Sequence, residues 1–256
     1  MQPTDTTYYQ SLLDNLRYLN LTHLEQELPE YIDRVQKREL SFLEALHALT
    51  TVEVDKKRFT AMTHAIRSAG FPHRKELKDF DFAFQSGVNR NQIYDLATLG
   101  FIERKENIVF LGTPGVGKTH LSVALGIEAA KHRISTYFAK ANDMLARLRK
   151  ARDENRLDYQ LRYYTRYSLL IIDELGFLPI QQGDEKLLFQ VIDKRYERKS
   201  TIVTTNVQFA AWGDLFVEPT IANAILDRLL HHSHVVTIIG DSYRTKDLIS
   251  QKEKTD

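Results

Sequence analysis

Short apolar runs alternate with longer helical stretches in the part of the chain that follows Glu106. The runs read IVFLG, STYFAK, SLLIIDE, STIVTTN and HVVTIIG, and each has the length of a buried strand. Near-continuous apolar strands that alternate with helices are typical of a parallel sheet covered on both faces. The pattern therefore predicts an α/β fold with a five-stranded parallel sheet.

Helical periodicity dominates the first part of the chain, from Tyr8 to about Ser68. Two candidate capping boxes support this prediction, Thr22 with Glu25 and Ser41 with Glu44. Pro29 falls inside the first of these helices and is expected to kink or divide it. The segment has no cluster of catalytic residue types, so we expect a small all-helical domain that binds a partner or another copy of the chain.

Stop signals and a change of pattern suggest three parts. Gly70 and Pro72 end the helical region, which gives a helical N-terminal domain over 1–72. Residues 73–106 carry turn signals and are predicted to form a linker and one helix. Residues 107–256 form the predicted α/β domain.

Composition narrows the classes of protein that the chain can be. The 256 residues carry 35 Lys and Arg against 34 Asp and Glu, so a nucleic-acid surface would depend on how these charges are distributed. The chain has no cysteine, which excludes disulfides and thiolate chemistry. The sequence has no signal peptide and no apolar window long enough for a membrane span. We expect a soluble cytoplasmic protein with no membrane partner.

A complete P-loop motif, GTPGVGKT, lies between the first predicted strand and the helix that follows it. Its glycines allow backbone N–H groups to surround phosphates, Lys118 reaches the β and γ oxygens, and the Thr119 hydroxyl can bind Mg²⁺. The residues expected to contact the nucleotide are Gly112, Thr113, Pro114, Gly115, Val116, Gly117, Lys118, Thr119 and His120.

Two adjacent carboxylates end the strand SLLIIDE. Asp173 is the expected second ligand of Mg²⁺, and Glu174 is the expected general base that activates water. An activated water favours hydrolysis over transfer to a small acceptor, although two acidic residues can also simply end a strand. No Asn-Lys-x-Asp guanine motif follows, so ATP is preferred over GTP and the predicted activity is a Mg²⁺-dependent ATPase.

Asn206 ends the next strand, in the sequence TTN. Its amide could bind the γ-phosphate or the attacking water, and it could equally be an Asn that caps the end of a strand.

These motifs, together with LLIIDELGFLP, FAAWGDLF and AILDRLLHHSHVVTIIGDSYR, resemble the AAA+ ATPases of the IstB/DnaC group, and most closely the IstB-type transposition helper proteins of insertion sequences. The resemblance covers nearly the whole chain. It implies an AAA+ core that acts as a homo-oligomer with ATP between subunits. It also implies that Asn206 senses the γ-phosphate and that Arg228 reaches the site of a neighbouring subunit, with Arg244 a weaker second candidate.

The resemblance also implies that the chain has no C-terminal helical lid. Only the segment DSYRTKDLISQKEKTD follows the last predicted strand, and it is too short for one.

A basic stretch between Lys140 and Arg166 is a candidate DNA-binding surface. Its basic residues are Lys140, Arg147, Arg149, Lys150, Arg152, Arg156, Arg162 and Arg166. Basic side chains interleaved with tyrosines can follow a phosphate backbone, but charge runs are more often solvated surfaces. The corresponding insertion of the family lines a DNA-binding surface, which favours duplex binding with little sequence preference.

Three histidines, His231, His232 and His234, lie between the last helix and the last strand. Their neighbours in the sequence supply no carboxylate or cysteine to complete a metal site, so the sequence predicts none here.

Together these features predict an ATP-dependent regulator of DNA transposition. The expected protein assembles on duplex target DNA and recruits a transposase of the same element, while hydrolysis controls assembly. Two alternatives stay open: a DnaC-like loader of a replicative helicase, and a DNA scaffold gated by a nucleotide that it scarcely hydrolyses.

Overall fold

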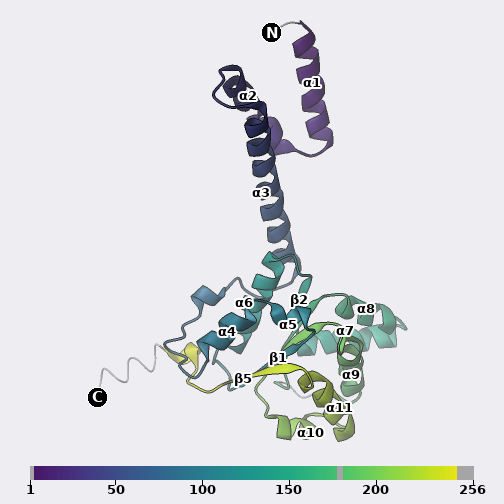
Figure 1. Ribbon diagram of the computed structural model, residues 1–256. Helices are drawn as coiled ribbons and strands as arrows, with labels where there is room; N and C mark the ends of the chain where they lie inside the picture. The colour runs from purple at the N-terminus through teal and green to yellow at the C-terminus, as the bar shows by residue number, and fades with distance from the viewer. Residues whose placement is uncertain (1–2, 178–180, 247–256) are drawn as a thin grey trace. The chain divides into compact units, whose positions relative to one another are not determined.

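The computed structural model describes residues 3–177 and 181–246. The chain divides into two compact units, Met1–His64 and Ala65–Asp256, which we call the helical unit and the sheet unit (Figure 1). The division falls before the predicted domain end at residue 72. No helix within the described ranges has the length and apolar character of a membrane span.

The helical unit contains α1 (Pro3–Tyr18), α2 (Thr22–Gln36) and most of α3 (Phe42–Ser68), and its core consists of four buried leucines, Leu16, Leu24, Leu28 and Leu49. The capping box at the start of α3 is confirmed. The Glu44 carboxylate accepts the Ser41 N–H at 2.8 Å, and the Ser41 hydroxyl accepts the Glu44 N–H at 3.3 Å.

The other predicted capping box, Thr22 with Glu25, is wrong. Leu21 precedes α2 and makes no side-chain cap. The buried carboxylate of Glu53, on α3, instead accepts the N–H groups of His23 and Leu24 at 3.0 and 3.1 Å. A carboxylate near the first N–H groups of a helix has the same effect as a cap on the helix itself.

Pro29 does not divide α2, which is continuous from Thr22 to Gln36.

All five predicted strands are present in the sheet unit. They are β1 (Asn107–Gly112), β2 (Thr136–Lys140), β3 (Leu169–Leu175), β4 (Ser200–Thr205) and β5 (Ser233–Ile238). Their order is β2-β3-β4-β1-β5, and all neighbouring pairs are parallel. The carboxyl ends of β1, β3 and β4 therefore meet at one edge of the sheet, where the predicted site residues lie.

Helices cover both faces of this sheet. Alternate residues of β3 belong to different core clusters, Leu169 and Ile171 to one and Leu170 and Ile172 to the other, as the alternation of side chains in a strand requires. The first cluster includes residues of α6 (Lys118–Lys131). The second includes residues of α7 (Ala141–Asp153), α8 (Leu157–Thr165), α9 (Asp184–Arg195) and α11 (Pro219–Leu230).

The predicted linker over 73–106 is part of the sheet unit. It contains a 3₁₀ turn, η1 (Leu77–Asp79), and two short helices, α4 (Arg90–Leu96) and α5 (Gly100–Glu103), where one helix was predicted. Three of its side chains, Phe80, Ile93 and Phe101, lie in the same core cluster as β1. An α/β domain that starts at residue 107 would lack this part of its core.

A short segment follows β5 and ends the described part of the chain. It contains one 3₁₀ turn, η3 (Tyr243–Thr245), and Lys246, the last described residue, is in helical conformation. Residues 247–256, the last part of the segment after β5, lie outside the described residues. The absence of a helical lid therefore stays a prediction.

Candidate active site

The P-loop has the backbone that its glycines predict. Gly115 and Gly117 adopt φ values of +87° and +98°, in the left-handed region. A Cβ on Gly115 would lie 2.0 Å from Oγ of Ser242, and a Cβ on Gly117 would lie 2.6 Å from Cε2 of Phe80. Both the conformation and the surrounding side chains therefore require glycine.

Lys118 begins α6 and folds back over the loop. Its ammonium donates to the carbonyl oxygens of Gly112 and Thr113, both at 2.8 Å. Burial lowers the pKa of Lys118, and the nearby carboxylate of Asp173 opposes this shift. The ammonium thus lies inside the loop, where it can bind a phosphate oxygen.

The two predicted Mg²⁺ ligands are in contact. The Asp173 side chain accepts the Thr119 hydroxyl at 2.9 Å, and it also accepts the Thr204 hydroxyl at 2.6 Å. Burial raises the pKa of Asp173, while these two hydrogen bonds lower it. A carboxylate and a hydroxyl beside a phosphate site form the oxygen donor set that Mg²⁺ prefers, so these residues fit the ion.

Glu174 has a strained backbone at the end of β3. Its φ is +60°, and the register between β3 and β4 shifts between Ile172 and Leu175. Its N–H donates to the Thr204 hydroxyl at 2.9 Å, and its carboxylate forms an ion pair with Lys140 at 2.9 Å. The strained backbone and the register shift thus lie where the strand carries two adjacent carboxylates that both line the cavity.

These residues line a cavity of about 430 Å³. Its wall includes nine residues predicted for the nucleotide site: Pro114, Gly115, Gly117, Lys118, Thr119, His120, Asp173, Glu174 and Asn206. The volume is in the range of small-ligand and cofactor sites. The structure therefore brings the P-loop, the acidic pair and Asn206 together in one cavity.

Three further parts of the wall lie outside the predicted motifs, and of their residues only Arg244 was a candidate. Thr204, whose hydroxyl donates to Asp173 and accepts from Glu174, comes from β4. A second part is the segment Pro72–Asp81, which includes His73, and burial lowers the pKa of both His73 and His120. Thr204 lies near the carboxyl end of β4, the strand next to β3, two residues before Asn206. This position was the available sequence signal.

The third part of the wall is the segment after β5, which closes over the P-loop. The Tyr243 N–H donates to the Gly115 carbonyl at 3.0 Å, and the Gln85 amide donates to the Asp241 carbonyl at 2.6 Å. Arg244 directly follows Tyr243 and lines the cavity. Arg244, the weaker of the two candidate arginines, therefore lies in the cavity of its own chain.

Arg228 is elsewhere, on α11. Its guanidinium donates to the Asp193 carboxylate at 2.9 Å and lies over the ring of Phe189 at 4.7 Å. It is not part of the cavity wall formed by the described residues. Within one chain Arg228 thus makes a surface ion pair, and any contact with nucleotide would have to be with that of another subunit.

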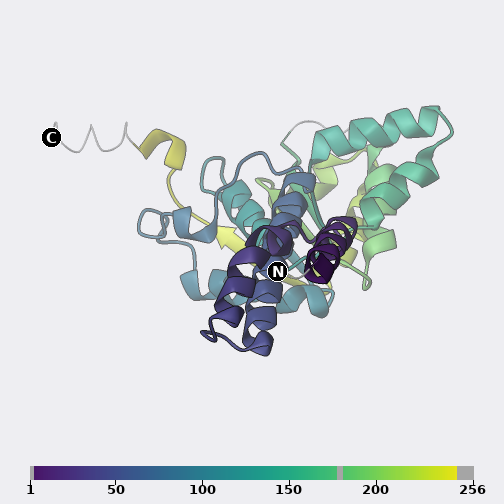
Figure 2. The ribbon, with the colours of Figure 1, turned by 90° about the horizontal axis from the view of Figure 1, so that it is seen from above.

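The basic stretch forms α7 and α8, which lie side by side (Figure 2), but its side chains differ in availability. Arg149 makes two hydrogen bonds, at 2.6 and 2.7 Å, to the buried carboxylate of Asp184, and Lys140 lies in the cavity wall. Lys150 and Arg162 are exposed and have neither an ion pair nor a tyrosine contact among the described residues. Arg147 and Arg166 contact tyrosines, and Arg152 and Arg156 pair with Asp153 and Glu154.

The family of the chain can be determined by comparison. The model of the family described as IstB-like ATP binding protein matches residues 14–251. The chain belongs to this family. A protein of Bacillus thuringiensis subsp. berliner, named as an ATP-binding protein of insertion sequence IS232, is 52% identical over 95% of this chain and 98% of its own length. A protein of Pseudomonas aeruginosa, named as an ATP-binding protein of insertion sequence IS21, is 41% identical over 91% of this chain and 88% of its own length.

Solved structures support the fold of this IstB-like chain. DnaI matches with a TM-score of 0.56 at 21% identity, covering 65% of this chain and 92% of its own. The DnaC helicase loader matches with a TM-score of 0.50 at 24% identity, covering 68% and 98%. The predicted fold class, a P-loop AAA+ core after a helical N-terminal region, is confirmed. At these identities the likeness concerns the fold alone.

Proposed function

We propose that this IstB-like protein is a Mg²⁺-dependent ATPase that assembles on duplex DNA and regulates transposition through a transposase. The observation that carries the proposal is the hydrogen-bonded group Thr119, Asp173, Thr204 and Glu174 beside the P-loop. Relatives named for insertion sequences support the transposition context. The protein would work in the cytoplasm with the DNA on which it acts.

Each side chain of the site has a distinct part in this proposal. Lys118 binds the β and γ oxygens, and Thr119 and Asp173 hold Mg²⁺. Bound Mg²⁺ neutralises charge that develops on the phosphates. Glu174 orients a water molecule and takes its proton, which requires its carboxylate to leave the ion pair with Lys140.

Two arginines would complete the site from different subunits. Arg244 acts in the cavity of its own chain, where it lies near Lys118. Arg228 would enter the cavity of a neighbouring subunit in a homo-oligomer, and would have to exchange its ion pair with Asp193 for the γ-phosphate. This arrangement would couple hydrolysis to assembly.

The proposed DNA contacts lie on α7 and α8, with Lys150 and Arg162 the most available side chains and Arg149 the least. Such contacts would be directed to phosphates and carry little sequence preference. The transposase would bind the DNA-bound oligomer, and the helical unit is the proposed site of docking or self-association.

Glu174→Gln separates binding from turnover. We expect this variant to bind ATP and to assemble on duplex DNA with near wild-type affinity, because the amide keeps the shape of the side chain. Its turnover should fall by about 10²–10⁴-fold, the usual contribution of a general base. Steady-state phosphate release and nucleotide titration measure the two properties, and turnover near the wild-type rate would disprove the assignment of the base.

Electron microscopy of the protein with ATP and duplex DNA, single-stranded DNA or neither tests the assembly. Oligomers that form on duplex DNA are expected. Assembly only on single-stranded DNA would favour a helicase loader, and equal behaviour with ATP and a non-hydrolysable analogue in a transposition assay would favour a scaffold. A monomer under all three conditions would contradict the proposal.

A further inference from the structure

A second group of metal-binding side chains lies away from the cavity. His231 and His232 stand between α11 and β5, and Glu197 stands in the turn between α9 and β4. Both turns lead into the amino ends of parallel strands, whereas the cavity lies at their carboxyl ends. None of the three residues lines the cavity.

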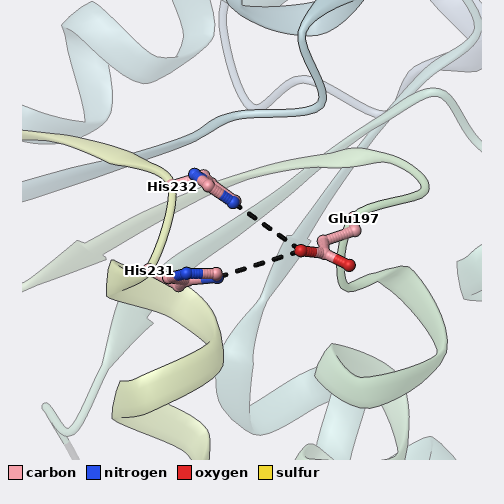
Figure 3. A group of neighbouring side chains, drawn as sticks. All are labelled: Glu197, His231 and His232. Carbon is pink, nitrogen blue, oxygen red and sulfur yellow. Dashed lines mark ion pairs between the residues drawn. The ribbon is translucent and has the colours of Figure 1, made fainter.

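The ligand atoms of this group converge (Figure 3). Oε1 of Glu197 lies 3.9 Å from Nδ1 of His231 and 3.6 Å from Nε2 of His232. One ligand atom from each of the three residues lies within 4.8 Å of those of the other two. Ligands at about 2.0 Å from a tetrahedral ion are about 3.3 Å apart. Because all three side chains are exposed, small rotations bring them to bonding distance.

The hydrogen bond to His231 is compatible with a metal ligand. Nδ1 of His231 lies 2.5 Å from the hydroxyl oxygen of Tyr196. If that hydroxyl donates, Nδ1 is the unprotonated nitrogen of the ring, which is the form that binds a metal. An ion would replace this hydrogen bond without requiring the ring to lose a proton.

The local charge is also compatible with a cation. Glu197 contributes a carboxylate, and the nearest arginine on the helix that leads to the histidines, Arg228, is paired with Asp193. Glu197 adopts φ +55° in the turn shortly before β4.

We propose that Glu197, His231 and His232 bind a divalent transition-metal ion. Two imidazoles and one carboxylate suit Zn²⁺, with water in the fourth position. The ion would connect the end of α11 to the turn after α9. Because Arg228 lies on the last turn of α11, the ion would also restrain the backbone that carries this arginine.

Titration of the untagged, nucleotide-free, full-length protein with Co²⁺ tests the site. Tetrahedral Co²⁺ absorbs visible light, and we expect saturation at one equivalent and displacement by Zn²⁺. His232→Asn and Glu197→Gln should each weaken binding by more than about tenfold, as the loss of a metal ligand does. The matched control is His132→Asn, which removes another exposed histidine that lies next to a carboxylate, Glu128, and should leave the titration unchanged.

Zn²⁺ should also raise the melting temperature of the wild type and of His132→Asn but not that of the two ligand variants. Equal Co²⁺ affinity in His232→Asn and His132→Asn would overturn the proposal, as would the lack of a saturable absorption band. Nucleotide plays no part in either measurement, so the outcome is independent of the proposed ATPase function.

Discussion

Neighbouring carboxylates on β3 differ because their surroundings differ. Asp173 is 1% exposed and accepts two hydroxyl groups, whereas Glu174 is half-buried at the cavity wall and pairs with Lys140. A buried carboxylate that accepts hydroxyl groups suits a metal ligand, and a carboxylate that solvent can reach suits a base. The backbone strain at Glu174 produces this difference between adjacent residues.

Asp173→Asn should stabilise the protein without nucleotide. Burial raises the pKa of Asp173 in the folded protein above its value in the unfolded chain. The folded state therefore binds the carboxyl proton more tightly. As the pH rises from the unfolded-state pKa to the folded-state pKa, the free energy of unfolding of the protein falls. At neutral pH the charged form therefore costs stability. We therefore expect the neutral variant to melt at a higher temperature than the wild type.

The same variant should lose the additional stability that Mg²⁺-ATP gives the wild type, because a Mg²⁺ ligand is gone. Thermal melts with and without Mg²⁺-ATP measure both effects. A lower melting temperature of the variant without nucleotide would contradict this account of the buried carboxylate.

At the scale of elements, a buried arginine joins the end of α9 to β4, to α8 and to the turn between α8 and β3. The Arg195 guanidinium donates to the Thr201 hydroxyl and to the carbonyl oxygens of Tyr164, Tyr167, Ser168 and Ser200, at 2.5–3.4 Å. No carboxylate pairs with it in the described part of the chain. Burial lowers the pKa of Arg195, and the ring of carbonyl oxygens stabilises its charge.

Arg195→Met should be strongly destabilising, because several buried carbonyl groups lose their donor. We expect a loss of about 3 kcal/mol, from a cost of about 1–3 kcal/mol for each unsatisfied buried group. Chemical denaturation measures the change, and Arg198→Met, at an exposed position three residues later, is the matched control. Equal stability of the two variants would rule out a structural role for these hydrogen bonds.

The boundary between the two units leads to a prediction for the whole molecule. A fragment that begins at Ala65 should fold and bind ATP, since it contains the complete sheet unit. A fragment that begins at Asn107 should fail to fold, because it lacks Phe80, Ile93 and Phe101. Each large apolar side chain contributes about 1.5–3 kcal/mol by burial, and the sum approaches the stability of a typical domain.

Circular dichroism and thermal melts of the two fragments decide between these outcomes. A folded fragment 107–256 would instead support the sequence-based prediction, in which residues 73–106 are a linker and one helix outside the α/β domain.

Mixing of inactive variants tests which arginine acts between subunits. Lys118→Ala abolishes ATP binding but keeps Arg228, so it should supply that arginine to an Arg228→Ala neighbour. At equal proportions and random assembly, about a quarter of the shared sites would be complete. Phosphate release should therefore recover in this mixture.

Arg244→Ala provides the comparison, because Arg244 and Lys118 line the same cavity. Its mixture with Lys118→Ala contains no neighbour that can replace the missing arginine, so turnover should stay low. Recovery in both mixtures, or in neither, would contradict the assignment of the two arginines.

The strands and the phosphate loop could be predicted from the sequence because their signals are local. Five apolar runs indicated five strands, and GTPGVGKT followed by an acidic strand end indicated the phosphate loop and the acidic pair. Backbone conformation and side-chain spacing within a few residues decide such features. The capping box at Ser41 and Glu44 belongs to the same class.

Tertiary structure alone decided which distant residues meet. Glu53 caps α2 from α3, Thr204 connects Asp173 to Glu174, and Arg244 reaches the cavity that contains Lys118. The carboxylate that His231 and His232 lack in the sequence comes from Glu197, in a turn more than thirty residues earlier. Periodicity and motif spacing carry no record of these contacts, because each arises only when separate elements pack against one sheet.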